Sequence, residues 1–297
     1  MDTQIAAKNS IDQHANQSRG IWADSFSRLL RQKSAIFGLI IVLTLICAAI
    51  FAPYIAPYNP EKGVLGDRLQ APSEGHWLGT DSQGRDILSR IIFGSRISIQ
   101  IGIITVGISL VVGTFMGALS GYFGGVLDLL VMRFIDIMMA FPYILLAIAI
   151  TAVLGPSLVN AMIAIGIVGI PIYARVVRGA VLSVKENEYV EAARAVGCSK
   201  WRIIWRHVLP NCIAPIIVQA TLGIGTAILD SAGLSFLGLG AKPPKSEWGL
   251  MLNQGKDSLQ TAPWAVMFPG LAILLVVLGF NLLGDGLRDA LDPKLKE

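Results

Sequence analysis

Long stretches of this sequence are apolar and almost free of charge, and they constrain the fold more than any other feature. No charged residue occurs between Ser34 and Pro60, between Ile97 and Leu127, or between Trp264 and Gly284. A membrane-spanning helix needs roughly 20 such residues. Three further apolar runs cover residues 131–154, 157–174 and 212–240. The sequence therefore predicts an all-α integral membrane protein with about six transmembrane helices.

The composition argues against several other classes of protein. Charged residues make up 15% of the chain, whereas soluble domains average about 25%. A formal net charge of +4 is weak evidence for a nucleic-acid partner, and we expect none. Cys47, Cys198 and Cys212 lack metal or redox spacing and are interpreted as plain thiols.

Catalytic and metal-binding patterns are also missing from the sequence. The three histidines, at 14, 76 and 207, are scattered, so we expect no metal site. The G-x-x-x-x-G-K-[ST] phosphate-binding loop is absent, and no catalytic triad stands out. We therefore predict that the chain is not an enzyme, has no ATPase site and binds no cofactor.

The distribution of lysine and arginine predicts the orientation. With the N-terminus inside the cell, 16 of the 24 basic residues fall in inner segments, as expected because basic residues collect on the cytoplasmic side. The predicted parts are a cytoplasmic segment (1–33), a first span (34–57), an extracytoplasmic segment (58–96), a five-helix core (97–285) with a cytoplasmic loop (179–210), and a cytoplasmic tail (286–297). Both termini are thus predicted to be cytoplasmic.

Glycine and proline inside the spans predict close packing and kinks. The 31 glycines gather in stretches such as GISLVVGTFMG, and small residues allow membrane helices to approach closely. Pro142, Pro171, Pro215 and Pro269 lie within spans and are expected to bend them or to free backbone groups.

The most highly charged segment lies between two apolar spans, in EYVEAARAVGCSKWRIIWRHVLPN, residues 188–211. Its first part predicts a helix with Val190, Ala193 and Gly197 on one face, ended by that glycine. Ser199 can cap a second helix. In that helix an apolar stripe is expected, formed by Trp201, Ile204, Trp205 and Val208. These patterns fit equally a loop resting on the membrane surface or a docking interface for another protein.

A few polar residues are candidates for other sites. Asp230 lies in the fifth span, where a charge should face the bundle interior or water. It either meets the amino terminus of a peptide, caps a broken helix or bonds across a subunit interface; Gln219 and Asn160 are weaker candidates of the same kind. Near the inner end of the third span, Arg133 and Asp136 are expected to pair.

Before the second span, a group of charged residues is predicted to lie outside the membrane. Their spacing suits ion pairs along an exposed helix face, or a rim that contacts another subunit. The group consists of Asp81, Arg85, Asp86, Arg90 and Arg96.

The loop carries a resemblance to a known family. Glu191-Ala192-Ala193, then Gly197 after three residues, then Leu209-Pro210, resembles the EAA motif of ABC importer membrane subunits. That motif favours an aliphatic residue where this chain has His207; the peptide-importer branch often has His-x-Leu-Pro-Asn there. Three further stretches, 76–98, 233–252 and 268–297, resemble the DppC/OppC type of permease, and the resemblance covers nearly everything after the first 30 residues.

The resemblance implies a type I ABC importer (MetI-like) fold in the bacterial cytoplasmic membrane. It implies that the loop binds an ATPase subunit through Glu191, Ala192, Ala193, Gly197, Cys198, Ser199, Trp201, Arg202, Leu209 and Pro210. Implied partners are a second, similar permease, two ATPase subunits that use ATP and Mg, and an extracytoplasmic peptide-binding protein. The implied cargo is dipeptides or oligopeptides, with glutathione, haem or nickel complexes as alternatives. A self-contained secondary transporter and a membrane enzyme are the rival classes.

Overall fold

The computed structural model describes residues 27–291, which fold mainly into helices. Residues 1–26 of the predicted N-terminal segment and 292–297 of the predicted tail lie outside the described residues. The long helices are α3 (Lys33–Ile55), α4 (Ile87–Phe123), α5 (Gly125–Ala140), α6 (Tyr143–Leu154), α7 (Leu158–Val184), α10 (Ile213–Phe236) and α12 (Trp264–Leu291). Shorter helices are α8 (Glu188–Ala195), α9 (Lys200–Ile203) and α11 (Trp248–Gly255).

The predicted number of spans agrees with the helices in this range. Five helical segments are long and apolar enough to cross a membrane, and α5 with α6 can form a sixth span that is bent by 92°. The all-α membrane architecture is thus confirmed, with a broken helix as its third span. The break has a local cause: Phe141 is extended because a residue before proline avoids helical geometry, and Pro142 precedes the first turn of α6.

Several observed helix ends differ from the predicted segments. Helix α4 begins at Ile87, inside the segment 58–96 that was assigned to the extracytoplasmic side. Helix α7 continues to Val184, inside the predicted loop 179–210, and α12 reaches Leu291, inside the predicted tail. The helices therefore project beyond the charge-free runs at both ends of the bundle.

Glycines bring α4 and α7 into close contact. Gly113, Gly117 and Gly121 recur every four residues along α4 and are all buried against α7. A Cβ at Gly113 would lie 2.5 Å from the Tyr173 Cβ, and one at Gly121 would lie 3.0 Å from the Arg178 carbonyl oxygen. Small residues at this spacing let two membrane helices pack backbone to backbone, so these two helices form a tight central pair.

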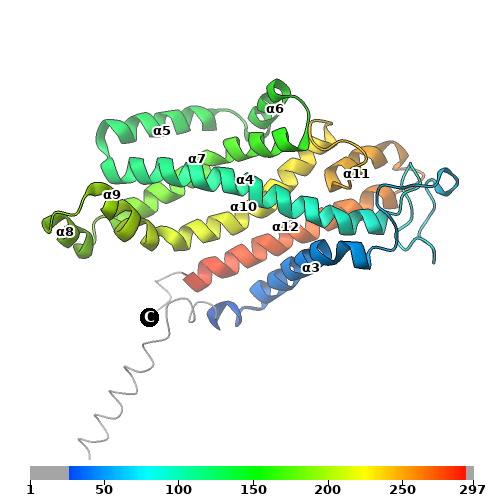
Figure 1. Ribbon diagram of the computed structural model, residues 1–297, viewed down its shortest axis with the longest axis horizontal. Coiled ribbons are helices and arrows are strands. Elements are labelled where there is room, and N and C mark those ends of the chain that lie inside the picture. The colour runs from blue at the N-terminus through cyan, green and yellow to red at the C-terminus, as the bar shows by residue number, and fades with distance from the viewer. Residues whose placement is uncertain (1–26, 292–297) are drawn as a thin grey trace, which may run out of the picture.

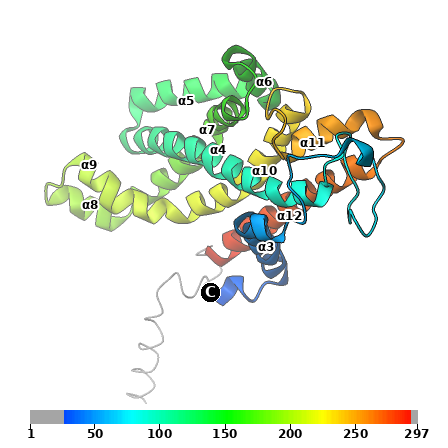
Figure 2. The same cartoon turned by 45° about the vertical axis from the view of Figure 1, so that its right-hand side comes forward.

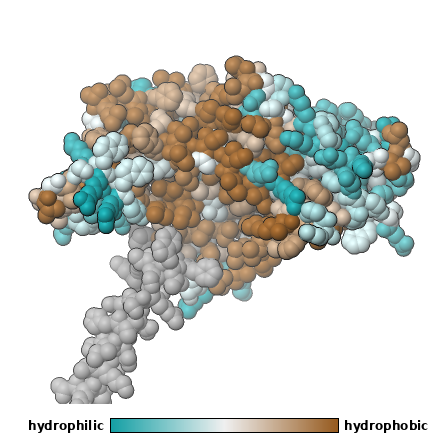
Figure 3. Space-filling model, in the orientation of Figure 1, coloured by the Kyte–Doolittle hydropathy of each residue, from teal (hydrophilic) through white to brown (hydrophobic). Residues whose placement is uncertain are grey.

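The remaining helices surround this pair in two groups (Figure 1). Helix α3 packs on α12 where Gly38 meets Gly279, and α12 packs on α10. Helices α5 and α6 lie on the side away from α3 and α12, which the turned view also shows (Figure 2). Apolar side chains form a broad band around the middle of the molecule, with hydrophilic surface concentrated at both ends (Figure 3). This band is the surface expected to face lipid.

Candidate functional site

A helical hairpin, residues 188–211, projects from one end of the bundle (Figure 1). Its first helix, α8, ends in a Schellman motif: Gly197 has φ +79°, its N–H donates to the Arg194 carbonyl, and the Cys198 N–H donates to the Ala193 carbonyl. Ser199 then caps α9 by accepting a hydrogen bond from the Arg202 N–H. The local geometry is therefore the helix, glycine turn and second helix that the sequence indicated.

The hairpin is fixed to the bundle by a buried apolar cluster. Val190, Ile203, Ile204 and Val208 are almost fully buried and pack with Val177, Val181 and Ala118 at the adjoining ends of α7 and α4. Two cation–π contacts add to this attachment, from Arg194 to Tyr122 and from Lys200 to Phe123. The hairpin and the ends of these long helices consequently form one packed unit.

The expected stripe in the second hairpin helix is only partly correct. Ile204 and Val208 are buried, but Trp201 and Trp205 are 51% and 58% exposed. A π-helical turn over residues 204–208 alters the helical period, and the buried face is centred on Ile203 and Ile204. Both tryptophans instead border an apolar surface groove with α4, as suits indoles at a membrane boundary.

The opposite face of α8 is open to solvent. Glu191 and Ala192 are exposed while Ala193 beside them is buried. Because the side chain of Ala192 is small, the backbone beside Glu191 is accessible. Of the other residues expected in an ATPase contact, Arg202 and Pro210 are exposed, whereas Leu209 is buried in the apolar cluster. The hairpin thus offers a polar outer surface on a rigid base.

Ion pairs tie α5 to α7 at the hairpin end of the bundle. Arg178 donates from Nε and Nη2 to the two carboxylate oxygens of Asp128, each at 2.6 Å. Asp136 pairs with Arg175 at 2.7 Å, so the expected pairing with Arg133 is wrong. Asp136 pairs with Arg175 and not with its sequence neighbour Arg133 because α7 runs alongside α5 and brings Arg175 within reach.

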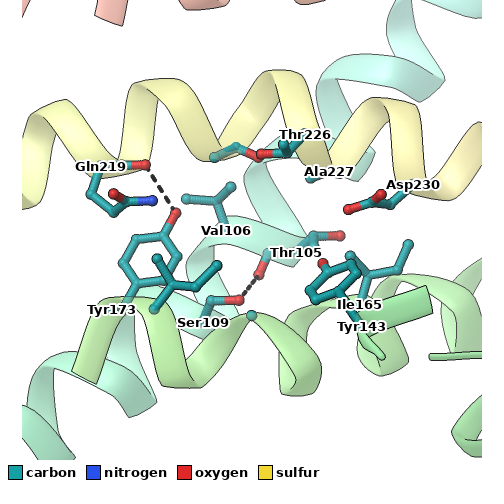
Figure 4. Close-up of a pocket in the computed structure, with 13 residues that line it drawn as sticks. Thr105, Val106, Ser109, Tyr143, Ile165, Tyr173, Gln219, Thr226, Ala227 and Asp230 are labelled. Carbon is teal, nitrogen blue, oxygen red and sulfur yellow. Dashed lines mark hydrogen bonds between the residues drawn. The ribbon is translucent and has the colours of Figure 1, made fainter. Parts of the chain in front are cut away.

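A cavity of about 340 Å³, lined by both polar and apolar side chains, lies between α4, α6, α7 and α10 (Figure 4). Two of the predicted candidates, Asp230 and Gln219, both line it. They are eleven positions apart on α10, which is about three turns and roughly 16 Å. Gly223 and Thr226 fill the intervening positions on the same face, so a continuous polar and small-residue stripe faces the cavity.

Hydroxyl groups supply most of the remaining polarity of the cavity. Ser109 on α4 donates to the Gly166 carbonyl at 2.6 Å, and the Tyr173 hydroxyl donates to the Gln219 carbonyl at 3.3 Å. Gly223 makes room for Tyr173, since a Cβ there would clash with its hydroxyl. Tyr143, Tyr173 and Thr226 were not predicted; the spacing i, i+4, i+7, i+11 from Gln219 is the signal that identifies the α10 face.

Asn160 is not part of this cavity. Its amide donates to the carbonyls of Leu154 and Gly155, at 2.8 and 2.9 Å, and so satisfies the C-terminal end of α6. It therefore stabilises the turn between α6 and α7.

At the other end of the bundle, four of the charged residues before the second span are buried, so the expectation of exposed ion pairs is wrong for Asp81, Arg85, Asp86 and Arg90. Asp81 accepts hydrogen bonds from Arg85 (2.8 Å) and Arg90, and these three side chains are at most 7% exposed. Gln254 in α11 accepts from both arginines. Asp86 caps α4 by accepting from the Ser89 N–H at 2.7 Å. The spacing of these residues in the sequence could not show that α11 packs over Arg85 and Arg90.

Glu247 completes this end of the molecule. Its carboxylate accepts hydrogen bonds from the N–H groups of Gly249 and Leu250 and caps α11. Burial raises the pKa of Glu247, and these two N–H donors and the nearby Arg90 partly oppose that effect. Arg96 reaches the carbonyls of Ala49 and Ile50 in α3. The segment before α4, α11 and the end of α3 are therefore joined by polar contacts.

These features define a class: a polytopic helical membrane protein with a docked hairpin at one end and, between its helices, a cavity with several polar side chains. Comparison with known proteins assigns the family. Residues 109–297 match the model of binding-protein-dependent transport system inner membrane components, and residues 20–72 match the N-terminal TM domain of oligopeptide transport permease C. The chain belongs to the family of binding-protein-dependent transport system inner membrane components.

Curated relatives match along most of the chain. The dipeptide transport system permease protein DppC of Alkalihalophilus pseudofirmus is 55% identical, over 93% of this chain and 90% of the relative. The DppC protein of Haemophilus influenzae is 50% identical, over 90% and 92%. The glutathione transport system permease protein GsiD of Pectobacterium atrosepticum is 49% identical, over 93% and 92%. The chain is therefore similar to transport permeases over nearly its whole length.

A solved structure supports the fold. A chain from an inward-facing structure of the MetNI methionine ABC transporter superposes with a TM-score of 0.58 at 20% identity, covering 69% of this chain and 98% of the other. The predicted MetI-like fold is thus confirmed. Its family makes the chain a multi-pass inner membrane protein of a transport system that includes ATPase and binding-protein components.

Proposed function

We propose that this chain is one permease subunit of an ATP-driven importer for dipeptides and related short peptides, glutathione among them. The names of its relatives support this cargo class, because two are dipeptide permeases and one is a glutathione permease. The single observation that carries the mechanism is the hairpin at residues 188–211, which is packed into the bundle on one face and open to solvent on the other.

The hairpin is the proposed contact with an ATPase subunit, on the cytoplasmic side. Seven lysines and arginines lie between residues 175 and 210, which supports that orientation. In this proposal both chain termini lie in the cytoplasm. In this proposal ATP and Mg are used by two separate ATPase subunits, and this chain has no ATPase site and binds no cofactor. A second, similar permease completes the pathway, and an extracytoplasmic binding protein delivers the peptide.

Force would pass from the hairpin into the bundle along α10. The segment Lys200–Phe236 is continuously helical, so the second half of the hairpin leads directly into the helix that carries Gln219 and Asp230. Closure of the ATPase pair would displace the hairpin together with the ends of α4 and α7, because the buried cluster joins them. The cavity face of α10 would then shift relative to α6, which exposes the pathway to one side or the other.

Substitution of Gly197 tests this coupling. Valine is strained at φ +79° by about 1–3 kcal/mol, so Gly197→Val should misplace α9 relative to α8. We expect the complex to assemble and hydrolyse ATP, while ATP-dependent uptake of a dipeptide into proteoliposomes falls by about tenfold or more. Asparagine tolerates positive φ, so Gly197→Asn is the matched control and should retain most uptake. Normal uptake by Gly197→Val would refute the coupling role, and uptake by this chain without ATPase subunits would indicate a secondary transporter.

A further inference from the structure

The cavity contains a carboxylate without a counter-charge. Asp230 is the one ionisable acid in its lining, which includes no lysine, arginine or histidine. Within residues 27–291, Asp230 takes part in no ion pair. A charge inside a membrane protein is costly unless it meets a partner or water, and such residues mark substrate or ion pathways. A carboxylate in this setting is suited to meet a cationic group that enters the cavity.

The surroundings of Asp230 are suited to a primary ammonium group. Asp230 on α10 faces Thr105 on α4 and Tyr143 on α6 across the cavity (Figure 4). An ammonium carries three N–H donors, which a carboxylate and two hydroxyl oxygens can accept. The hydroxyl protons of Ser109 and Tyr173 are already donated to backbone carbonyls, so those groups line the cavity without competing for the carboxylate.

The cavity also has room for the rest of a small peptide. Its volume of about 340 Å³ is within the usual range of roughly 300–1,000 Å³ for small-molecule sites. Val106, Ile165 and Ile172 form an apolar wall beside the polar stripe, suitable for a side chain or backbone methylene. A polar end and an apolar wall together fit an amino-terminal residue better than a bare metal ion.

We propose that Asp230, with the hydroxyls of Tyr143 and Thr105, binds the primary ammonium group of the transported peptide as it crosses the membrane. This inference rests on the proposed peptide import. Ile213 at the start of α10 and Asp230 are separated by about 26 Å of continuous helix at 1.5 Å per residue. The carboxylate is thus carried by the helix that follows the hairpin, while Tyr143 belongs to α6, so hairpin movement changes the site and allows release.

Uptake by the reconstituted complex gives the first test. The probes are Ala-Ala and N-acetyl-Ala-Ala. The uptake of each probe by a variant is divided by the uptake of the same probe by wild type, so that the preference of the binding protein for one probe cancels. A charge-assisted hydrogen bond is worth a factor of roughly ten to a hundred. Asp230→Asn should therefore lower Ala-Ala uptake at least about tenfold, and Asp230→Glu should retain more of it. Asp257→Asn, at an exposed carboxylate, is the control and should match wild type.

Site occupancy gives a second test that does not depend on transport. Thr226→Cys places a thiol in the cavity lining, and its alkylation by a maleimide is followed by mass spectrometry of the peptide containing residue 226. We expect millimolar Ala-Ala to slow this alkylation in the solubilised complex and N-acetyl-Ala-Ala to have no effect. The protection should disappear when Asp230→Asn is added.

The outcomes separate this inference from the function on which it rests. If wild type imports Ala-Ala but Asp230→Asn does so equally well, or if both probes protect the thiol of Thr226→Cys equally, the ammonium site is refuted and peptide import stands. Loss of uptake in Asp230→Asn with protection unchanged would assign Asp230 a structural role and also refute the site. If wild type imports no peptide with its ATPases present, the proposed function fails and this inference fails with it.

Discussion

Neutralising Asp81 should destabilise the end of the molecule opposite the hairpin. Asp81→Asn keeps the shape of the side chain, so the remaining Oδ1 can still accept hydrogen bonds from the N–H groups of Gln83 and Arg85. The change removes the negative charge that Arg85 and Arg90 share. Each arginine already has one buried nitrogen without a partner, Nη1 of Arg85 and Nε of Arg90. The site therefore has little capacity to compensate.

The size of the effect follows from burial. Arg85 is 1% exposed and Arg90 0%, and removing one partner of a buried ion pair costs about 3–5 kcal/mol. At 1.4 kcal/mol for each factor of ten, local opening of this region should become roughly a hundredfold to several thousandfold more frequent. The nearby carboxylate of Glu247 offsets part of the uncompensated charge, which favours the lower end of that range.

Amide hydrogen exchange measures this opening directly. The Ile87 N–H donates to the Gly79 carbonyl at 3.1 Å and should exchange faster in Asp81→Asn by the factor given above. Glu61→Gln is the matched control, because it makes the same carboxylate-to-amide change at an exposed position in the same segment, where about 0.5 kcal/mol or less is expected. Exchange of Ile87 within about threefold of the control would refute the reasoning, since the charge of Asp81 would then contribute little.

Two further predictions concern packing. Gly113→Leu should lower the thermal midpoint of the solubilised protein and cost about 1–3 kcal/mol or more of stability, because the new Cβ would lie 2.5 Å from the Cβ of Tyr173. The control is Gly107→Leu on the same helix, where a Cβ meets nothing within 4 Å, and it should be tolerated. A similar loss in both variants would contradict the close α4–α7 contact. Ile204→Ala should cost about 2–5 kcal/mol, measured by denaturation, and Trp201→Ala less, since Trp201 is 51% exposed; the reverse order would show that the register of the hairpin is wrong.

The sequence predicted those parts of the fold that depend on neighbouring residues. Hydrophobic runs identify spans because lipid requires about 20 consecutive apolar residues whatever packs against them. The turn of the hairpin was predictable for the same reason: only Gly197 among its neighbours adopts a positive φ without strain, and Ser199 lies where a helix cap is needed.

The parts that could not be predicted depend on distant residues or on a change of helical period. Gln254, which contacts Arg85 and Arg90, is more than 160 positions away, so spacing alone suggested exposed pairs. In the second hairpin helix, Ile203 and Ile204 are buried against α7 and α4 while Trp201 is exposed, and the helical period changes over residues 204–208. The presence of a bend near Phe141 could be predicted, because Pro142 lies within a span, but the angle of the bend depends on packing against α7.

The arrangement of α10 explains why its polar residues are tolerated in an otherwise apolar helix. Gln219, Gly223, Thr226 and Asp230 share one face, and that face lines the cavity. A stripe with this spacing stays aligned over three turns of a straight helix, so one rigid movement of α10 displaces all four positions together. Polar residues scattered over several helices would not move together when the hairpin moves. The helical segment Lys200–Phe236 contains both the second half of the hairpin and the polar stripe that lines the cavity. In the proposed transport cycle, one helical segment therefore connects the ATPase contact to the peptide pathway.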